Sequence, residues 1–176
     1  MRAWKGYIPI PAIASISRSD VNRVLSRYPR CHVLDLGSGR GRISEFLRDN
    51  GFEVLSVDLD EGMTTICRDS GLQTMLMDAV YLAFRDCSFQ LVVSDGLLEH
   101  FRNPLQIINE EARVSSRWVL NLVPKDSRLN AVLERVQLVP KEYRYGHMVW
   151  RRMHLQAFSN VSITELKRLY AIRCEK

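Results

Sequence analysis

The feature that most constrains this fold is the stretch from Val33 to Phe46, "VLDLGSGRGRISEF". An apolar run is interrupted by an Asp, three glycines follow at alternate positions, and a helical pattern begins after them. Glycines let the backbone turn sharply and let a ligand approach without meeting a Cβ, while the next helix N-terminus offers unpaired N–H groups. The stretch therefore predicts a nucleotide-binding strand–loop–helix.

Strand-like and helix-like segments alternate over the first 123 residues, which predicts a doubly wound α/β sheet with right-handed crossovers. The run "FQLVVS" is typical of a strand buried on both faces of a parallel sheet. We expect strands at Cys31–Leu36, Glu53–Val57, Gln73–Met77, "FQLVVS" and "RWVLNLV". We expect helices at Ser19–Tyr28 (capped by Ser17 or Ser19), from the glycines to Gly51, at Gly62–Asp69, and from Asn103 to Val114.

The pattern loosens after Pro124. A helix is expected over Ser127–Val136, whereas Val139–Phe158 shows no firm period. The β-prone runs Val161–Thr164 and Leu169–Cys174 have little chain between them, so they predict an antiparallel pair at the sheet edge.

The spacing of the glycines narrows the choice of ligand class. A dinucleotide-binding fingerprint, G-x-G-x-x-G, would require glycine at position 42, where this chain has Arg42. The glycines are Gly37, Gly39 and Gly41, giving D-x-G-x-G-x-G. No G-K-[ST] follows, which excludes a P-loop.

The ordered series of motifs resembles the class I S-adenosylmethionine-dependent methyltransferases, with a nicotinamide or flavin Rossmann domain as the alternative. The matching segments are "LDLGSGRGRI", "VLSVDLD", "LMDAVYLAF", "RDCSFQLVVSD" and "LLEHFRNP". The last resembles the ubiquinone-biosynthesis-like branch. The resemblance implies S-adenosylmethionine as cofactor and S-adenosylhomocysteine as product. It also implies a Rossmann-like, mostly parallel sheet of seven strands in the order 3-2-1-4-5-7-6, with an antiparallel C-terminal strand.

The resemblance also implies which residues contact the cofactor. Asp58 has two acceptor oxygens for both ribose hydroxyls, and Asp78 receives the adenine amino group. Asp35 accepts from the methionine ammonium or orients the loop. The alternatives to cofactor binding are structural: Asp60 would cap a helix, and Asp78 would be a turn residue. The full set of expected cofactor contacts is Asp35, Gly37, Ser38, Gly39, Gly41, Asp58, Leu59, Asp78, Ala79 and Ser94.

Methyl transfer from a sulfonium is an in-line displacement, so the protein chiefly aligns the acceptor and excludes water. His100 is the candidate base, with packing against the loop as its alternative. Glu99 and His100 match the end of an E-x-x-E-H metal pattern, but Gly96 replaces its first Glu, so we predict no metal. An N-P-P-[YF] sequence is absent at Ser94–Leu97, which disfavours adenine-N6 chemistry.

The segment "YRYGHMVWRRMH" is the candidate acceptor pocket. Its aromatic residues suit stacking on a planar acceptor, and its arginines suit an acidic group. The alternative is a surface excursion with a partly buried Trp. The candidate substrate-binding residues are Tyr143, Tyr145, His147 and Trp150.

Composition is that of a folded protein, with 46% hydrophobic and 26% charged residues among 176. We expect a single domain: an N-terminal segment (1–30), a cofactor-binding core (31–123), an acceptor-side region (124–157) and a C-terminal strand pair (158–176). Four separated cysteines without a C-x-x-C pair favour reduced thiols and a cytoplasmic location. The N-terminus imitates a signal peptide, but two prolines interrupt its apolar run.

Charge is unevenly distributed. Residues 1–111 carry a net charge of −3 and residues 112–176 carry +8. The leading interpretation is a methyltransferase acting on a small molecule at an O, N or C atom, with no membrane partner. One alternative is an RNA or protein methyltransferase that uses the basic C-terminal third. Another is a non-catalytic, cofactor-binding partner subunit.

Overall fold

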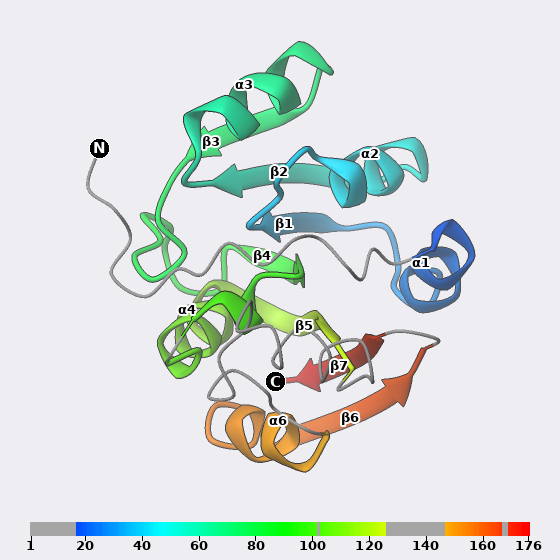
Figure 1. Cartoon of the computed structure of the whole chain (residues 1–176), viewed down its shortest axis with the longest axis vertical. Helices are drawn as coiled ribbons and strands as arrows, with labels where there is room; N and C mark the ends of the chain where they lie inside the picture. The colour runs from blue at the N-terminus through cyan, green and yellow to red at the C-terminus, as the bar shows by residue number, and fades with distance from the viewer. Residues whose placement is uncertain (1–16, 102, 126–146, 167–168) are drawn as a thin grey trace, which may run out of the picture.

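A computed structural model describes residues 17–101, 103–125, 147–166 and 169–176. They form one seven-stranded sheet in the order β3-β2-β1-β4-β5-β7-β6, which confirms the expected order (Figure 1). The strands are β1 (His32–Leu36), β2 (Glu53–Asp58), β3 (Gln73–Leu76), β4 (Phe89–Asp95), β5 (Ser115–Pro124), β6 (Asn160–Glu165) and β7 (Leu169–Glu175). The helices are α1 (Arg18–Leu25), α2 (Arg42–Asp49), α3 (Glu61–Asp69), η1 (Leu98–His100), α4 (Leu105–Val114) and α6 (His147–His154).

Strands β1 to β5 run parallel, and β7 pairs antiparallel with both β5 and β6. The expected C-terminal pair is therefore confirmed, with β7 inserted inside the sheet and β6 at its edge. The chain reverses its direction of travel across the sheet between β1 and β4. Doubly wound sheets generally bind ligands in a crevice outside the carboxyl ends of the two strands at such a reversal, which here are β1 and β4.

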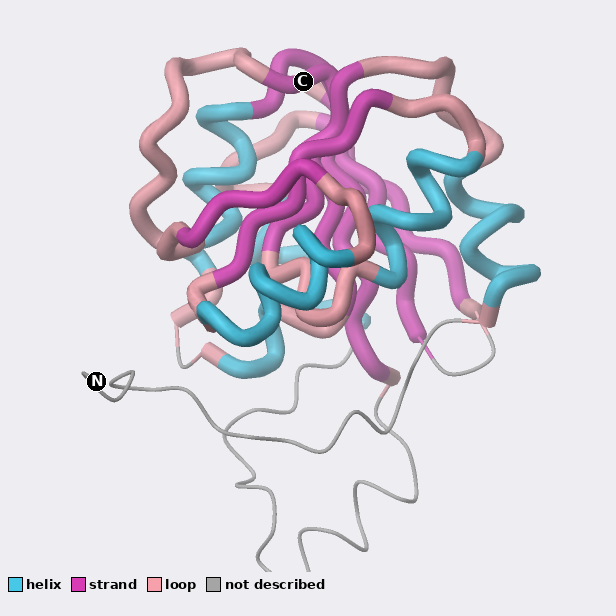
Figure 2. Tube along the Cα trace, turned by 90° about the horizontal axis from the view of Figure 1, so that it is seen from above, coloured by secondary structure: helices cyan, strands magenta, loops and turns pink. Residues whose placement is uncertain are grey.

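Helices cover both faces of the sheet, as the view from above shows (Figure 2). Alternation along the strands assigns Val33 to one face and Leu34 to the other, and both are fully buried. The Val33 face packs against α1 and α2. The Leu34 face packs against α4 and α6. Strand β4 is buried on both faces, as its unbroken apolar run predicted.

Local signals set most helix boundaries. Ser17 caps α1 by accepting a hydrogen bond from the Asp20 N–H, which decides between the two expected caps. Asp60 caps α3 through the Met63 N–H. Helix α6 was not predicted, because no firm helical period was recognised over these residues, and the structure corrects that prediction. The helix expected at 127–136 lies outside the described residues.

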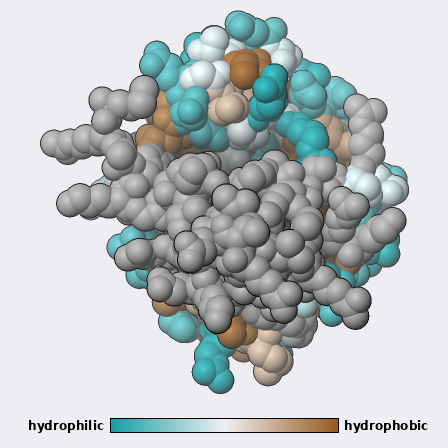
Figure 3. Space-filling view, in the orientation of Figure 1, coloured by the Kyte–Doolittle hydropathy of each residue, from teal (hydrophilic) through white to brown (hydrophobic). Residues whose placement is uncertain are grey.

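The described surface is largely hydrophilic in the orientation of Figure 3, with hydrophobic residues in small groups. Among the described residues, no helix is long and apolar enough to cross a membrane. The four cysteines are free, and Cys67 and Cys174 are buried.

Candidate functional site

The glycine loop is tied to the end of the neighbouring strand. The backbone N–H groups of Gly37 and Ser38 both donate to the Val57 carbonyl, at 2.8 and 3.0 Å. All three loop glycines have positive φ, the region that favours glycine. A Cβ on Gly39 would meet no atom within 4 Å, so the loop leaves open space at this glycine. At Gly41, by contrast, a Cβ would lie 2.5 Å from Leu72 Cδ1.

Asp58 ends β2 beside this open space. Its Oδ2 accepts a hydrogen bond from the Gly39 N–H at 2.8 Å, and its Oδ1 accepts one from the Asp60 N–H at 2.9 Å. Each carboxylate oxygen has two lone pairs, so one on each oxygen stays available to a ligand. Leu59, the next residue, is half-buried. The carboxylate is thus fixed in orientation and still able to accept two hydroxyl groups.

Asp78 is brought next to Asp58. The N–H of Met77 donates to the Asp58 carbonyl at 2.9 Å, which places the loop after β3 against the end of β2. Asp78 Oδ1 accepts from the Val80 N–H at 3.0 Å, so this residue also makes the turn considered in its alternative interpretation. Ala79 is buried.

Asp35 links β1 to α2 on either side of the glycine loop. It is 1% exposed, and its Oδ2 accepts a hydrogen bond from Ser44 Oγ in α2 at 2.6 Å. Ser44 also shares a hydrogen bond with Ser56 of β2 at 2.7 Å. Burial raises the pKa of Asp35 to about 7, an effect that the Ser44 hydrogen bond opposes. These contacts orient the loop between β1 and α2, which is one of the two expected roles of Asp35.

The loop after β4 closes over the glycine loop. A Cβ on Gly37 would lie 2.7 Å from Leu97 Cδ1, so the two loops are in direct contact. At the end of β4, Asp95 Oδ2 accepts from the Arg42 guanidinium at 2.6 Å. Two carboxyl groups, Asp95 and Glu99, therefore lie at the carboxyl end of β4, beside the crevice.

Behind this edge lies a buried polar network that the sequence did not predict. Ser94 Oγ donates to Asn121 Oδ1 at 2.7 Å, and Asn121 Nδ2 donates to Glu111 Oε2 at 2.8 Å. The same amide nitrogen lies 2.9 Å from His154 Nε2, which must accept because an amide nitrogen only donates. The proton of His154 is then on Nδ1, which donates to the Trp150 carbonyl at 2.8 Å.

This network bears on the role of Ser94. Its side chain is buried and directed to Asn121, which leaves only its backbone for a cofactor contact. Burial raises the pKa of Glu111 to about 7 and lowers that of His154 to about 4, so both groups favour their neutral forms.

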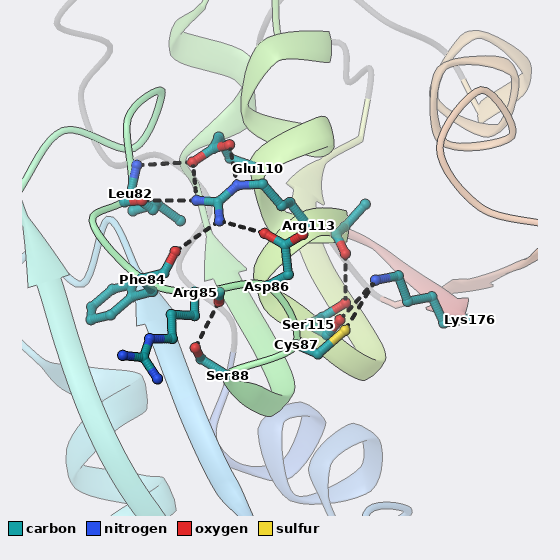
Figure 4. Close-up of polar contacts among 11 residues, drawn as sticks. Leu82, Phe84, Arg85, Asp86, Cys87, Ser88, Glu110, Arg113, Ser115 and Lys176 are labelled. Atoms are coloured by element: carbon teal, nitrogen blue, oxygen red, sulfur yellow. Dashed lines mark hydrogen bonds and ion pairs between the residues drawn. The ribbon is translucent and has the colours of Figure 1, made fainter.

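The loop that carries Asp78 is held by Arg113 of α4 (Figure 4). The guanidinium donates to the Leu82 and Phe84 carbonyls at 2.8 and 2.7 Å. It also pairs with Glu110 at 2.7 Å and Asp86 at 2.9 Å. The single side chain thus fixes the connection between β3 and β4.

The candidate acceptor residues are only partly brought to the site. His100 lies in η1 at intermediate exposure, two residues beyond buried Leu98. Tyr143 and Tyr145 lie outside the described residues, and His147 begins α6. Trp150 was expected to stack on an acceptor. It is instead 1% exposed and packs in the core against the sheet. Among the described residues, no group of three or more His, Cys, Asp or Glu could hold a metal ion.

Comparison with known proteins agrees with this geometry. Residues 34–117 match the methyltransferase domain family. The fold resembles that of the PH0226 protein from Pyrococcus horikoshii, with a TM-score of 0.73 and 23% identity over 99% of this chain and 96% of that one. It also resembles magnesium protoporphyrin IX methyltransferase from Synechocystis with bound S-adenosylhomocysteine, with a TM-score of 0.72 and 17% identity over 90% and 80% of the chains.

One curated relative shares higher local identity. A probable tRNA methyltransferase 9B of Mus musculus is 32% identical over 90 residues, which is 49% of this chain and 20% of the mouse protein. The chain therefore spans about a fifth of that relative, so the likeness concerns one domain of it.

Proposed function

We propose that this chain is a class I S-adenosylmethionine-dependent methyltransferase, as its match to the methyltransferase domain family supports, and that it transfers the donor's methyl group to a small molecule. The observation that carries the acceptor class is the charge around the crevice. Asp58 and Asp78 lie at or after the carboxyl ends of β2 and β3, and Asp95, which pairs with Arg42, lies at that of β4. Such an edge suits a cationic donor and a compact acceptor, and it repels a phosphate backbone.

On the donor side, we assign the ribose hydroxyls to the two remaining lone pairs of Asp58. The adenine amino group lies toward Asp78, because the Met77–Asp58 hydrogen bond places that loop beside β2. The open space at Gly39 supports a close approach of the ligand to the backbone. With the adenosine over β2 and β3, the methionine end of the donor points toward β1 and β4.

Several charges of the basic C-terminal third are already used within the fold. Arg113 pairs with Glu110 and Asp86, and Lys125 pairs with Glu165 at 2.8 Å. Arg173 lies 3.8 Å from Glu175. The net charge of +8 already includes Glu165 and Glu175, so only the pairing of Arg113 with Glu110 and Asp86, which precede residue 112, leaves less positive charge for a nucleic acid than this number suggests.

On the acceptor side, His100 is the proposed base. Its position in η1, directly after Glu99 and in the segment whose Leu97 lies against Gly37, supports this proposal. A His100→Gln change is expected to lower the methylation rate while leaving the affinity for the donor unchanged.

A second candidate is RNA methylation, favoured by the local identity to the probable tRNA methyltransferase. In that case exposed Arg151 and Arg152 of α6 are candidate phosphate contacts. RNA binding would weaken steeply with salt, because phosphate contacts release counterions.

The experiment that tests the proposal supplies tritium-labelled S-adenosylmethionine with either a low-molecular-mass metabolite extract or bulk tRNA. We expect label to enter the metabolite fraction and not the tRNA, and an Asp58→Ala variant to incorporate none. Incorporation into tRNA alone would overturn the small-molecule proposal and leave the RNA candidate.

A further inference from the structure

Glu99 is a buried carboxyl, and no described residue gives it a counter-charge. Its side chain lies in η1, the residue is 9% exposed, and its Oε2 has no hydrogen-bond partner among the described residues. Its Oε1 lies over Gly96, where a Cβ would stand 3.4 Å away. A buried carboxyl with an unused oxygen costs free energy unless a partner arrives.

The charges near Glu99 are of its own sign. Of the described charged groups, only Asp95 has a Coulombic effect on the pKa of Glu99, and it raises that pKa. Asp95 in turn raises the pKa of Asp35, and so does Asp58. Arg42 of α2, which pairs with Asp95, is the cation that acts on the Asp95 pKa. Strand β5, on which η1 also packs, brings no charge that affects Glu99.

The position of Glu99 follows from two contacts. Leu97 rests on Gly37, so η1 lies over the loop between β1 and α2. The methionine end of the donor points to this same part of the crevice when Asp58 holds the ribose. That end carries the sulfonium and the ammonium, the two positive charges of S-adenosylmethionine, whereas S-adenosylhomocysteine lacks the sulfonium charge.

We propose that Glu99 recognises the sulfonium end of the donor and loses its proton when the donor binds. The inference rests on the proposed function, because it requires S-adenosylmethionine in this crevice. Before binding, burial, reinforced by Asp95, raises the pKa of Glu99 to about 8, so the carboxyl is mostly protonated at neutral pH. A bound sulfonium favours the carboxylate. After methyl transfer the sulfonium charge is gone, Glu99 takes up a proton again, and the product is held less tightly than the donor.

Isothermal titration calorimetry tests this without an acceptor. Titrating S-adenosylmethionine at about pH 7 in phosphate and in Tris, which differ in ionisation enthalpy, gives the number of protons released. We expect the wild-type protein to release roughly half a proton or more with S-adenosylmethionine and close to none with S-adenosylhomocysteine. Its preference for the donor over the product should grow roughly threefold to tenfold between about pH 6.5 and about pH 8.5.

Two variants complete the test. Glu99→Gln keeps the shape of the neutral carboxyl and should remove both the proton release and the pH dependence of the preference. Glu53→Gln, a change at a side chain that is 80% exposed at the start of β2, should behave as the wild type.

The outcomes separate the two proposals. If S-adenosylmethionine does not bind the wild type, the proposed function fails. If it binds without releasing a proton, or if Glu99→Gln releases as many protons as the wild type, the assignment of Glu99 is wrong and the proposed function stands. The wild-type comparison of donor with product decides the matter even if the variant fails to fold.

Discussion

The Gly39 N–H donates a 2.8 Å hydrogen bond to Asp58 Oδ2, joining the glycine loop to the end of β2. Both residues are predicted cofactor contacts, yet they also bind each other. The hydrogen bond holds the carboxylate beside the open space at Gly39. The protein itself therefore fixes the relative position of these two groups.

Replacing Asp58 should weaken cofactor binding. Asp58→Ala removes the two lone pairs assigned to the ribose hydroxyls and leaves the Gly39 N–H without its partner. We expect the affinity for S-adenosylmethionine to fall by at least about tenfold, measured by calorimetry. Asp60→Asn is the matched control, because Asn also caps a helix, and it should bind as the wild type. Wild-type affinity in Asp58→Ala would rule out the ribose assignment.

Two loop glycines should respond differently to alanine. Gly41→Ala places a Cβ 2.5 Å from Leu72 Cδ1 and 2.9 Å from Cys67 Sγ at a φ of +79°. Strain and overpacking together should lower the free energy of unfolding by about 2–4 kcal/mol. Gly39→Ala meets no protein atom, so it should lose only about 1–2 kcal/mol while weakening cofactor binding roughly tenfold or more. Thermal unfolding with calorimetry checks both, and equal losses of stability would contradict the assignment.

Arg113 should be needed for the loop between β3 and β4. Arg113→Lys keeps the charge but cannot reach two carbonyls and two carboxylates at once. We expect the free energy of unfolding to fall by about 2–3 kcal/mol in urea unfolding. Arg23→Lys serves as the control, since Arg23 pairs with Asp20 at 3.6 Å with its side chain 53% exposed, and should change little. A loss of the same size in the control would argue against a special role for Arg113.

Glu111 and His154 should have opposite effects on how the free energy of unfolding changes with pH. Folding raises the pKa of Glu111 from 4.5 to about 7, so its contribution is fully present below pH 4.5 and is lost as pH rises through about 7. Folding lowers the pKa of His154 from 6.5 to about 4, so its contribution is present above pH 6.5 and is lost as pH falls toward about 4.

Glu111→Gln should therefore lose less stability than the wild type on going from about pH 5 to about pH 8.5, by on the order of 1–2 kcal/mol. His154→Gln should flatten the acid side of the curve instead. Melting temperatures across this range measure both effects. Parallel curves for Glu111→Gln and the wild type would show that Glu111 does not titrate in this window.

Local sequence patterns predicted the class of the fold. The alternation of elements and the apolar run of β4 indicated a doubly wound α/β sheet, because each pattern depends on residues close together in the chain. The strand order came from the resemblance to the methyltransferase family, and the structure confirms it. Helix α6 was missed because no firm period was recognised over residues 139–158, the longer stretch that contains it. The helix itself is amphipathic, and its buried Trp150 and His154, four residues apart, are held by contacts with distant strands. The same contacts removed Trp150 from the acceptor candidates.

The sequence by itself indicated the alternation of strands and helices, the glycine loop, and the position of Asp58 and Asp78 after the second and third strands. Only the tertiary structure decided which polar groups lose contact with water. Ser44 joins Asp35 to Ser56, Asn121 joins Ser94 to His154, and Glu99 Oε2 is enclosed without a hydrogen-bond partner among the described residues. The physical reason is that burial of a carboxyl, and therefore its pKa, depends on every element packed around it, and these elements are far apart in the chain.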